Sequence, residues 1–424
     1  GLLNAKHNLL VVRVDSPNEM PDKTWSLHKR LIKGVLNHHD TRPAGAWSIN
    51  GQDANSGGIW QDVNLHFSQD LSITHLKTSN QLAATELSVQ LDEVNMSATI
   101  EIDTAQPLVE MQLALSLTPQ NTKAKSQVFE YVITPNQWLN TGNHHYKYVA
   151  KLTPKNIKTW WPKGYGEPAL YQLSASLSKN GRLLDESSQK LAFRTINYDK
   201  ANTAFLINGK RLFIKGTNYI ASPWLASMNR QAYATDIDLM QNAHINAIRV
   251  HAHIAGQDLY DVADEKGMLI WQDFPLQWGY EESEVFSLEA QRQAYDMLEL
   301  LDYHPSVFAW SGHNEPPWNA DWMKYKYTDY KPQQNRQLTA QVGAVLATDT
   351  TRYAHEYSAT NEHLWMGWYS GNWRDHAKRT NVSIVSEFGA QALPEVSVLK
   401  DIIPNNDLWP KTLDAKDPAW QSWD

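Results

Sequence analysis

No cysteine occurs among the 424 residues of the chain. Disulfides, thiolate metal sites and a cysteine nucleophile are therefore excluded, although this absence does not fix the compartment. The sequence also lacks any run of about 18 apolar residues, so no transmembrane helix is expected. A net charge of −8 without a long basic segment argues against a nucleic-acid partner.

Tryptophan, by contrast, is abundant, with 18 copies in 424 residues. Indole rings either pack in cores or stack on the flat faces of sugar rings, and composition leaves both interpretations open. The chain exceeds the size of one ordinary core, which predicts roughly two to four domains. Residues 1–4 lack the basic region and apolar run that open a signal peptide.

In the first part of the chain, apolar residues recur with a period near two, which is typical of β-strands. Residues 84–91, 111–117 and 170–177 alternate between apolar and polar side chains, and residues 9–14 form an apolar run of strand length. The third segment leads into Asn180-Gly181, a strong hairpin-turn signal. Short strands separated by polar turns predict β-sandwiches.

After residue 194, short apolar strands alternate with helical stretches. This order predicts a parallel sheet with helices outside it. The pattern suggests a (β/α)8 barrel that stops before its eighth strand. The expected strands are 212–216, 247–250, 268–271, 307–310, 353–357, 364–368 and 383–385, and the expected helices are 236–243, 259–266, 288–301 and 338–346.

Two glutamates stand at the ends of predicted barrel strands. Glu315 follows residues 307–310, and Glu387 follows residues 383–385. Barrel active sites lie at the carboxyl ends of the strands, and these two strands end across the barrel mouth from each other. A retaining glycosidase needs two carboxyls about 5–5.5 Å apart, one as nucleophile and one as acid and then base. The pair therefore indicates glycoside hydrolysis with retention.

With these motifs in place, the chain resembles glycoside hydrolase family 2, which includes β-galactosidases, β-glucuronidases, β-mannosidases and exo-β-glucosaminidases. Asn-Glu-Pro at 314–316 resembles the acid/base signature of the family, and Ser-Glu-Phe-Gly at 386–389 resembles its nucleophile signature. The resemblance implies that Glu315 is the acid/base and Glu387 the nucleophile, with no cofactor and no metal. Further matches, in the order of the family, are residues 56–60, 161–166, 205–210, 246–249 and 264–267.

The resemblance also implies a multidomain chain. Residues 1–70 are expected to be the C-terminal part of a jelly roll, residues 71–195 an Ig-like β-sandwich, and residues 196–424 an incomplete TIM barrel. On this interpretation the chain begins late in the jelly roll and ends after strand seven, as a piece of a longer polypeptide would.

Several segments favour the β-mannosidase-like branch of the family. Residues 271–274 resemble its third strand, and Trp365, a candidate sugar contact, stands where galactosidases and glucuronidases have a tyrosine. His251, also a candidate contact, departs from the pattern, because mannosidases have a tryptophan two residues after Arg249. Glucosaminidases have an acidic residue at this position, which suits the positive charge of an amino sugar. His251 is not acidic, so a glucosaminide is a less expected substrate. Asp53 is the candidate for a carboxylate that reaches the site from the N-terminal domain. The alternative to β-mannosidase specificity is β-galactosidase or β-glucuronidase specificity on the same scaffold.

Four other side chains complete the expected site. By resemblance, Asn314 bonds a sugar hydroxyl, and Arg249 holds the charge and position of the nucleophile. Asp273 is either a core ion pair or a sugar contact, and Trp318 either lines the aglycone side or packs. The expected partner is a terminal β-glycoside of an oligosaccharide or glycoconjugate, with no nucleic acid and no membrane; the oligomeric state is not predicted.

Two other classes of function stay open. His251 and His253 stand two residues apart on an expected strand, where they would share a face and could ligate a metal. No further ligand set with suitable spacing is apparent. The chain could also be a carbohydrate-binding remnant without turnover, because a barrel that lacks its eighth strand has two unpaired edges.

Overall fold

The computed structural model describes residues 7–15, 17, 19, 25–34, 58–68, 70–80, 82, 87–222, 225–367, 371–380, 382–389, 393–412, 414 and 416–422. Contacts divide the chain into two compact units, residues 1–360 and residues 361–424, and each is described by itself. Asp53 lies outside the described residues, as do residues 84–86 of the strand expected at 84–91.

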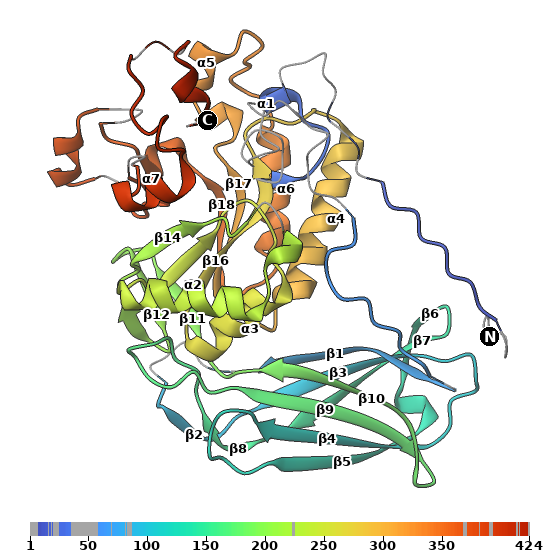
Figure 1. Cartoon of the computed structure of the whole chain (residues 1–424). Helices are drawn as coiled ribbons and strands as arrows, with labels where there is room; N and C mark the ends of the chain where they lie inside the picture. The colour runs from blue at the N-terminus through green and yellow to red at the C-terminus, as the bar shows by residue number, and fades with distance from the viewer. Residues whose placement is uncertain are drawn as a thin grey trace. The chain divides into compact units, whose positions relative to one another are not determined.

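Two antiparallel sheets form a β-sandwich that begins at residue 72 (Figure 1). The strand order is β1-β3-β7-β6 in one sheet and β10-β9-β4-β5 in the other, and the short strands β2 and β8 pair separately. The elements are β1 (Ser72–Asn80), β2 (Gln90–Glu93), β3 (Met96–Asp103), β4 (Met111–Pro119), β5 (Gln127–Ile133), η3 (Pro135–Gln137), β6 (Leu139–Gly142), β7 (His145–Leu152), β8 (Lys155–Lys158), β9 (Tyr171–Lys179) and β10 (Arg182–Leu191).

Alternating burial explains why these segments form a sandwich. Every second side chain of β4, from Met111 to Leu117, is buried, and β9 repeats this pattern beside it. Between β9 and β10 the chain reverses at Asn180 and Gly181, with φ angles of 50° and 78°. A two-residue turn with both φ angles positive matches the twist of the flanking strands. The strands predicted at 111–117 and 170–177, and the hairpin, are confirmed.

A small antiparallel sheet leads from the sandwich into a five-stranded parallel sheet, whose order β14-β15-β16-β17-β18 follows the sequence. Helices between successive strands cover it, as in other βαβ units. This sheet supplies five consecutive strands of the expected barrel. The elements are β11 (Ile196–Asp199), β12 (Ala204–Ile207), β13 (Lys210–Leu212), β14 (Gly216–Tyr219), η4 (Leu225–Ser227), α2 (Arg230–Asn242), β15 (Ala247–Val250), α3 (Gln257–Lys266), β16 (Leu269–Gln277), α4 (Glu284–Leu301), β17 (Val307–Asn314), η5 (Pro317–Asn319), α5 (Met323–Lys326), α6 (Arg336–Leu346) and β18 (Tyr353–Ser358).

Local signals set the ends of these helices. The Asn229 side chain accepts a hydrogen bond from Ala232 N at the start of α2, and Ser283 caps α4 in the same way. Helix α3 ends at Gly267, whose φ of 66° is left-handed. A Cβ on Gly267 would lie 2.7 Å from Lys163 N, so the close approach of the sandwich also requires glycine there.

Four predicted strands differ from the structure. Among the described residues of the segment 364–368, only Leu364 belongs to a strand. The segment 212–216 is divided between β13 and β14, because Phe213 points to solvent and the chain turns from an antiparallel to a parallel partner. Residues 383–385 are not a strand; β20 (Glu387–Phe388) comes later, so Glu387 lies in the strand itself. Residues 9–14 carry no strand assignment, and the apolar side chains there are exposed instead of packed.

Among the described residues before position 70, the short helix α1 (Trp25–His28) occurs, and the only strand-like feature is an isolated bridge between Lys29 and Tyr280. The jelly-roll part of the fold therefore stays a prediction. None of the described helices is long and apolar enough to cross a membrane.

The second unit contains a two-stranded parallel sheet of β19 (His363–Leu364) and β20, in which His363 pairs with Glu387. A small apolar cluster of Leu399, Ile403 and Leu408 packs around its helix α7. The remaining elements are η6 (Thr360–Glu362), η7 (Trp373–Ala377), α7 (Val396–Ile402) and η8 (Pro418–Ser422).

Candidate active site

Polar side chains gather at the carboxyl ends of the parallel strands. Arg249, near the end of β15, donates from Nε to Oδ1 and Oδ2 of Asp273 on β16, at 3.1 and 2.9 Å. Both residues are buried, with 5% and 2% of their surface exposed. Burial alone would raise the pKa of Asp273, but Arg249 and His251 hold it at about 2. The carboxylate is therefore ionised and paired at neutral pH.

The same guanidinium reaches across two further strands. Arg249 Nη2 donates to Asn314 Oδ1 on β17 and to Ser358 Oγ on β18, at 2.9 Å in each case. Because a guanidinium can only donate, the amide oxygen of Asn314 must face it and the Nδ2 donor must point elsewhere. The arrangement fixes which end of the Asn314 amide can meet a ligand.

Glu315 follows directly after β17. Its backbone has a φ of 45°, and its N–H donates to Ser358 O at 3.2 Å, so the chain leaves the sheet in a fixed direction. Trp278, the residue after β16, donates from Nε1 to Glu315 Oε2 at 3.0 Å. The half-buried carboxylate is thus held by a group from the neighbouring strand.

His251 and His253 do not share a strand face, as a metal pair on one strand would. Strand β15 ends at Val250, and Ala252 between them has a φ of 49° in a turn, so the shared strand face was wrong. His251 Nδ1 contacts Asp273 Oδ2 at 3.1 Å, whereas His253 Nδ1 contacts His251 O. Burial lowers the pKa of His253 to about 4, so its ring is neutral at pH 7.

Trp318 lies in η5, just after Glu315. Its Nε1 is 3.4 Å from Thr339 Oγ1, and its ring packs edge-on against Tyr357 with centroids 4.5 Å apart. The Arg336 guanidinium lies 4.5 Å from the ring centre. These contacts account for packing, and contact with an aglycone stays a prediction.

Glu387 belongs to the second unit. Its Oε2 lies 3.6 Å from His363 Nδ1 across the β19–β20 pair, and its side chain is 11% exposed. Gly389 has a φ of 137°, and a Cβ there would come within 3.8 Å of the Trp365 ring. The nucleophile candidate and Trp365 therefore share one small structural unit. The separation of Glu387 from Glu315 and Arg249, and the role of Asp53, stay predictions.

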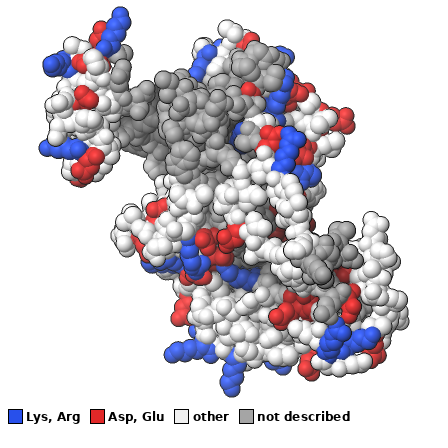
Figure 2. All heavy atoms as spheres, turned by 45° about the vertical axis from the view of Figure 1, so that its right-hand side comes forward, with Lys and Arg blue, Asp and Glu red and all other residues white. Residues whose placement is uncertain are grey.

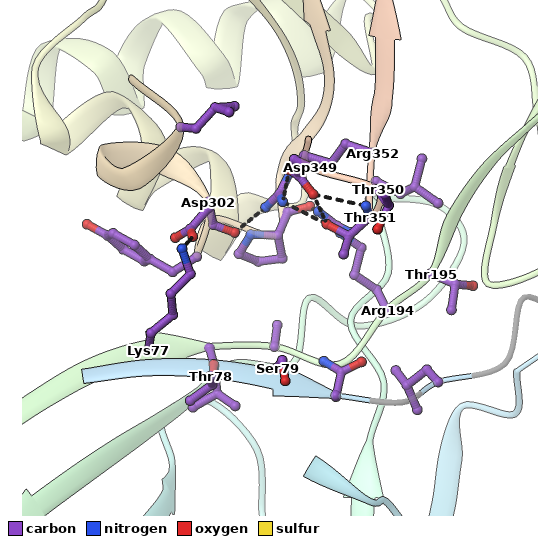
Figure 3. Close-up of a pocket in the computed structure, with 18 of the residues that line it drawn as sticks. Lys77, Thr78, Ser79, Arg194, Thr195, Asp302, Asp349, Thr350, Thr351 and Arg352 are labelled. Carbon is purple, nitrogen blue, oxygen red and sulfur yellow. Dashed lines mark hydrogen bonds and ion pairs between the residues drawn. The ribbon is translucent and has the colours of Figure 1, made fainter. Parts of the chain in front are cut away.

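A cavity of about 630 Å³ lies elsewhere, beside β1 and near the amino end of β18 (Figure 3). Lys77 reaches from β1 to Asp302, and Asp349 bonds Arg352 and Thr351 (Figure 3). Four of the charged groups around the cavity thus form two ion pairs, Lys77–Asp302 and Arg352–Asp349. Catalytic groups of barrels stand at the carboxyl ends of strands, so we place the site at Glu315 and not in this cavity.

One cluster of three possible metal ligands occurs in the described part of the chain: Asp261, Asp264 and His304. Lys190 from β10 donates to both aspartates, and Asp264 Oδ2 lies 2.6 Å from His304 Nδ1. The one ammonium offsets part of the charge of the two carboxylates, and its bonds fasten α3 to the sandwich. On the face drawn in Figure 2, acidic and basic side chains intermingle over the described atoms.

Sequence reasoning missed Trp278, Ser358 and His363. Trp278 and Ser358 follow or end barrel strands, the same signal that singled out Glu315. The apolar run before Trp278 stops at Trp271, although the strand continues to Gln277, so the sequence pattern does not place Trp278 at a strand end.

The chain joins a β-sandwich to a parallel sheet that carries polar groups at its carboxyl edge. This arrangement is typical of proteins in which a β-sandwich precedes a barrel domain. Within this class, the model of the glycosyl hydrolases family 2 matches residues 72–194, and that of the family's TIM barrel domain matches residues 200–403. The chain belongs to glycosyl hydrolase family 2.

Three relatives illustrate the similarity. A putative beta-glucuronidase of Formosa agariphila is 26% identical over 330 residues, covering 76% of this chain and 38% of the relative. Rat beta-mannosidase is 25% identical over 393 residues, covering 83% and 43%. The crystal structure of beta-D-mannosidase from Dictyoglomus thermophilum matches with a TM-score of 0.63 and 22% identity, covering 82% and 44%, and shows the shared fold. The chain spans less than half the length of each.

Proposed function

We propose that this chain carries the catalytic groups of a retaining exo-β-glycosidase, with Glu315 as acid/base and Glu387 as nucleophile. The observation that carries the proposal is the fixed pair Asn314–Glu315 at the carboxyl edge of the sheet. Arg249 orients Asn314, and Trp278 holds Glu315. Such pre-organised groups are what an acid catalyst and a sugar-hydroxyl donor require.

The chemistry needs two steps. Glu387 attacks the anomeric carbon while Glu315 gives its proton to the departing glycosidic oxygen, which leaves a glycosyl-enzyme ester. Glu315, now a carboxylate, takes a proton from the water that attacks the same carbon and releases Glu387. Asn314 Nδ2 donates to a hydroxyl of the bound sugar throughout.

A terminal β-mannoside is the proposed substrate, in a pocket that admits one terminal sugar. Trp365, the 271–274 segment and the similarity to rat beta-mannosidase support this sugar. The similarity to a putative beta-glucuronidase supports the alternative, a β-glucuronide. A β-galactoside is the third possibility for the same scaffold.

Proton NMR of the first-formed product tests the mechanism. The chain is incubated with aryl β-mannoside, β-glucuronide and β-galactoside in turn, and the anomer released is read before mutarotation. We expect the β-anomer from the mannoside. An α-anomer would contradict the nucleophile assignment, binding of the sugars without turnover would favour a carbohydrate-binding remnant, and loss of activity with a chelator would favour a metal-dependent hydrolase.

A further inference from the structure

Trp278 occupies a costly backbone conformation. Its φ is 60°, in the left-handed region that bulky residues avoid, and Glu315, its hydrogen-bond partner just after the next strand, has a φ of 45°. Such outliers persist only where the surroundings impose them, and they collect at functional sites. Trp278 and Glu315, which share this hydrogen bond, therefore both have strained backbone conformations, and they follow adjacent strands.

Backbone contacts hold Trp278 from the side of β17. Its N–H donates to Asn314 O at 2.9 Å, and His313 Nε2 lies 2.7 Å from Trp278 O. A carbonyl can only accept, so His313 must carry its proton on Nε2. Burial lowers the pKa of His313 to about 3, so this ring stays neutral. Trp278 is thus tied to the two residues that precede Glu315.

Residues 27–34, far away in the sequence, also hold the chain around Trp278 in place. The buried Lys29 donates from Nζ to Gln277 O at 2.5 Å, and its ammonium lies 5.7 Å from the centre of the Trp278 ring. Lys29 also exchanges backbone bonds with the chain just beyond Trp278, at Gly279 and Glu281. A cation near an indole face is attractive when both are shielded from water.

We propose that Trp278 is a positioning residue for Glu315, and that Lys29 of the 27–34 segment holds Trp278 in place. This inference rests on the proposed acid/base role of Glu315. Because an indole N–H can only donate, the contact favours a deprotonated Oε2. The transferable proton of the acid therefore resides on Oε1, and the carboxyl cannot rotate without losing the bond.

Trp278→Phe tests the kinetic consequence, because it keeps an aromatic ring and deletes the N–H. A misplaced acid matters most for poor leaving groups, so kcat/KM should fall about tenfold or more on an alkyl glycoside and only a few-fold on a dinitrophenyl glycoside. Trp310→Phe is the matched control, since Trp310 Nε1 donates to Asp349 Oδ2 at 2.9 Å near the opposite end of the sheet. Its losses should be equal on both substrates. Equal losses in Trp278→Phe would overturn the positioning role.

Indole NMR tests the contact without relying on turnover. The protein is labelled with ¹⁵N at the indole nitrogens, and the Trp278 signal is the one that disappears in Trp278→Phe. Glu315→Gln replaces a charged acceptor with an amide, so it should move this signal and leave that of Trp310 in place. A Trp278 signal that keeps its position in Glu315→Gln would overturn the proposal, even if the protein were an active glycosidase. A shifted signal in a protein without turnover would uphold the contact between Trp278 and Glu315 and contradict the proposed function.

Lys29→Met tests whether Lys29 holds Trp278 in place. Methionine fills similar space without charge, so the Trp278 signal should shift and the leaving-group dependence should move toward that of Trp278→Phe. Lys33→Met on the same segment is the control, because Lys33 Nζ donates to Pro17 O, away from Trp278. Identical spectra and kinetics for Lys29→Met and the wild type would overturn the part assigned to Lys29.

Discussion

Arg249 and Asp273 form a buried ion pair in which the guanidinium Nε lies within 3.1 Å of both carboxylate oxygens. The pair joins β15 to β16, and Nη2 of the same guanidinium continues to Asn314 and Ser358 on the next two strands. One side chain thereby couples four parallel strands at the edge where Glu315 emerges. Asp273 is accounted for as an ion pair, one of the two roles open from sequence.

Breaking this pair should destabilise the fold strongly. Arg249→Met leaves the Asp273 carboxylate buried without its main partner, and such changes cost about 3–5 kcal/mol. Urea unfolding of the variant measures the loss, and adding Asp273→Asn should restore part of it. Arg292→Met, which breaks an exposed pair with Glu289, should cost far less, because water screens that pair. Similar losses in the two single variants would contradict the account.

His313 should make the fold sensitive to acid. Its folded pKa is about 3, whereas the unfolded side chain titrates near its ordinary value of about 6.5. Between these values the unfolded chain binds the additional proton, so this contribution to stability is complete above about pH 6.5 and is lost as the pH falls toward 3.

Urea unfolding between pH 7 and pH 4 measures this effect. One such group contributes a slope of about 1.4 kcal/mol per pH unit, and His313→Asn should remove it. His144→Asn, at an exposed position in a turn of the sandwich, is the control and should leave the slope unchanged. An unchanged slope in His313→Asn would show that this histidine is not buried as a neutral ring.

The sequence predicted the elements better than the contacts at their ends. Apolar alternation and turn residues located β4, β9 and the helices, because burial of one face determines those segments. Strand β16 was expected to stop at Trp271, but it continues through Gln272, Asp273 and Gln277, which are buried polar residues. Their partners come from other segments: Gln272, for example, bonds Tyr260 and His253 O. No local pattern contains that information.

Glu387→Gln should abolish turnover and leave sugar binding largely intact, because the amide preserves size and removes the nucleophile. Steady-state rates on an activated aryl β-mannoside and calorimetric binding of mannose measure the two effects. Glu362→Gln is the matched change in the same unit, where Glu362 Oε2 accepts from Ser386 Oγ. Retention of more than roughly a thousandth of the wild-type rate by Glu387→Gln would remove Glu387 from the role.

Glu315→Ala with added azide tests the central assignment most directly. The variant should be far slower on alkyl than on activated aryl β-glycosides, because only the former need a proton to depart. Azide can occupy the space left by the carboxylate and attack the glycosyl-enzyme without a general base. The account predicts rescue on the activated substrate with a β-glycosyl azide as the product; equal losses on both substrates and no azide product would contradict Glu315 as the acid/base.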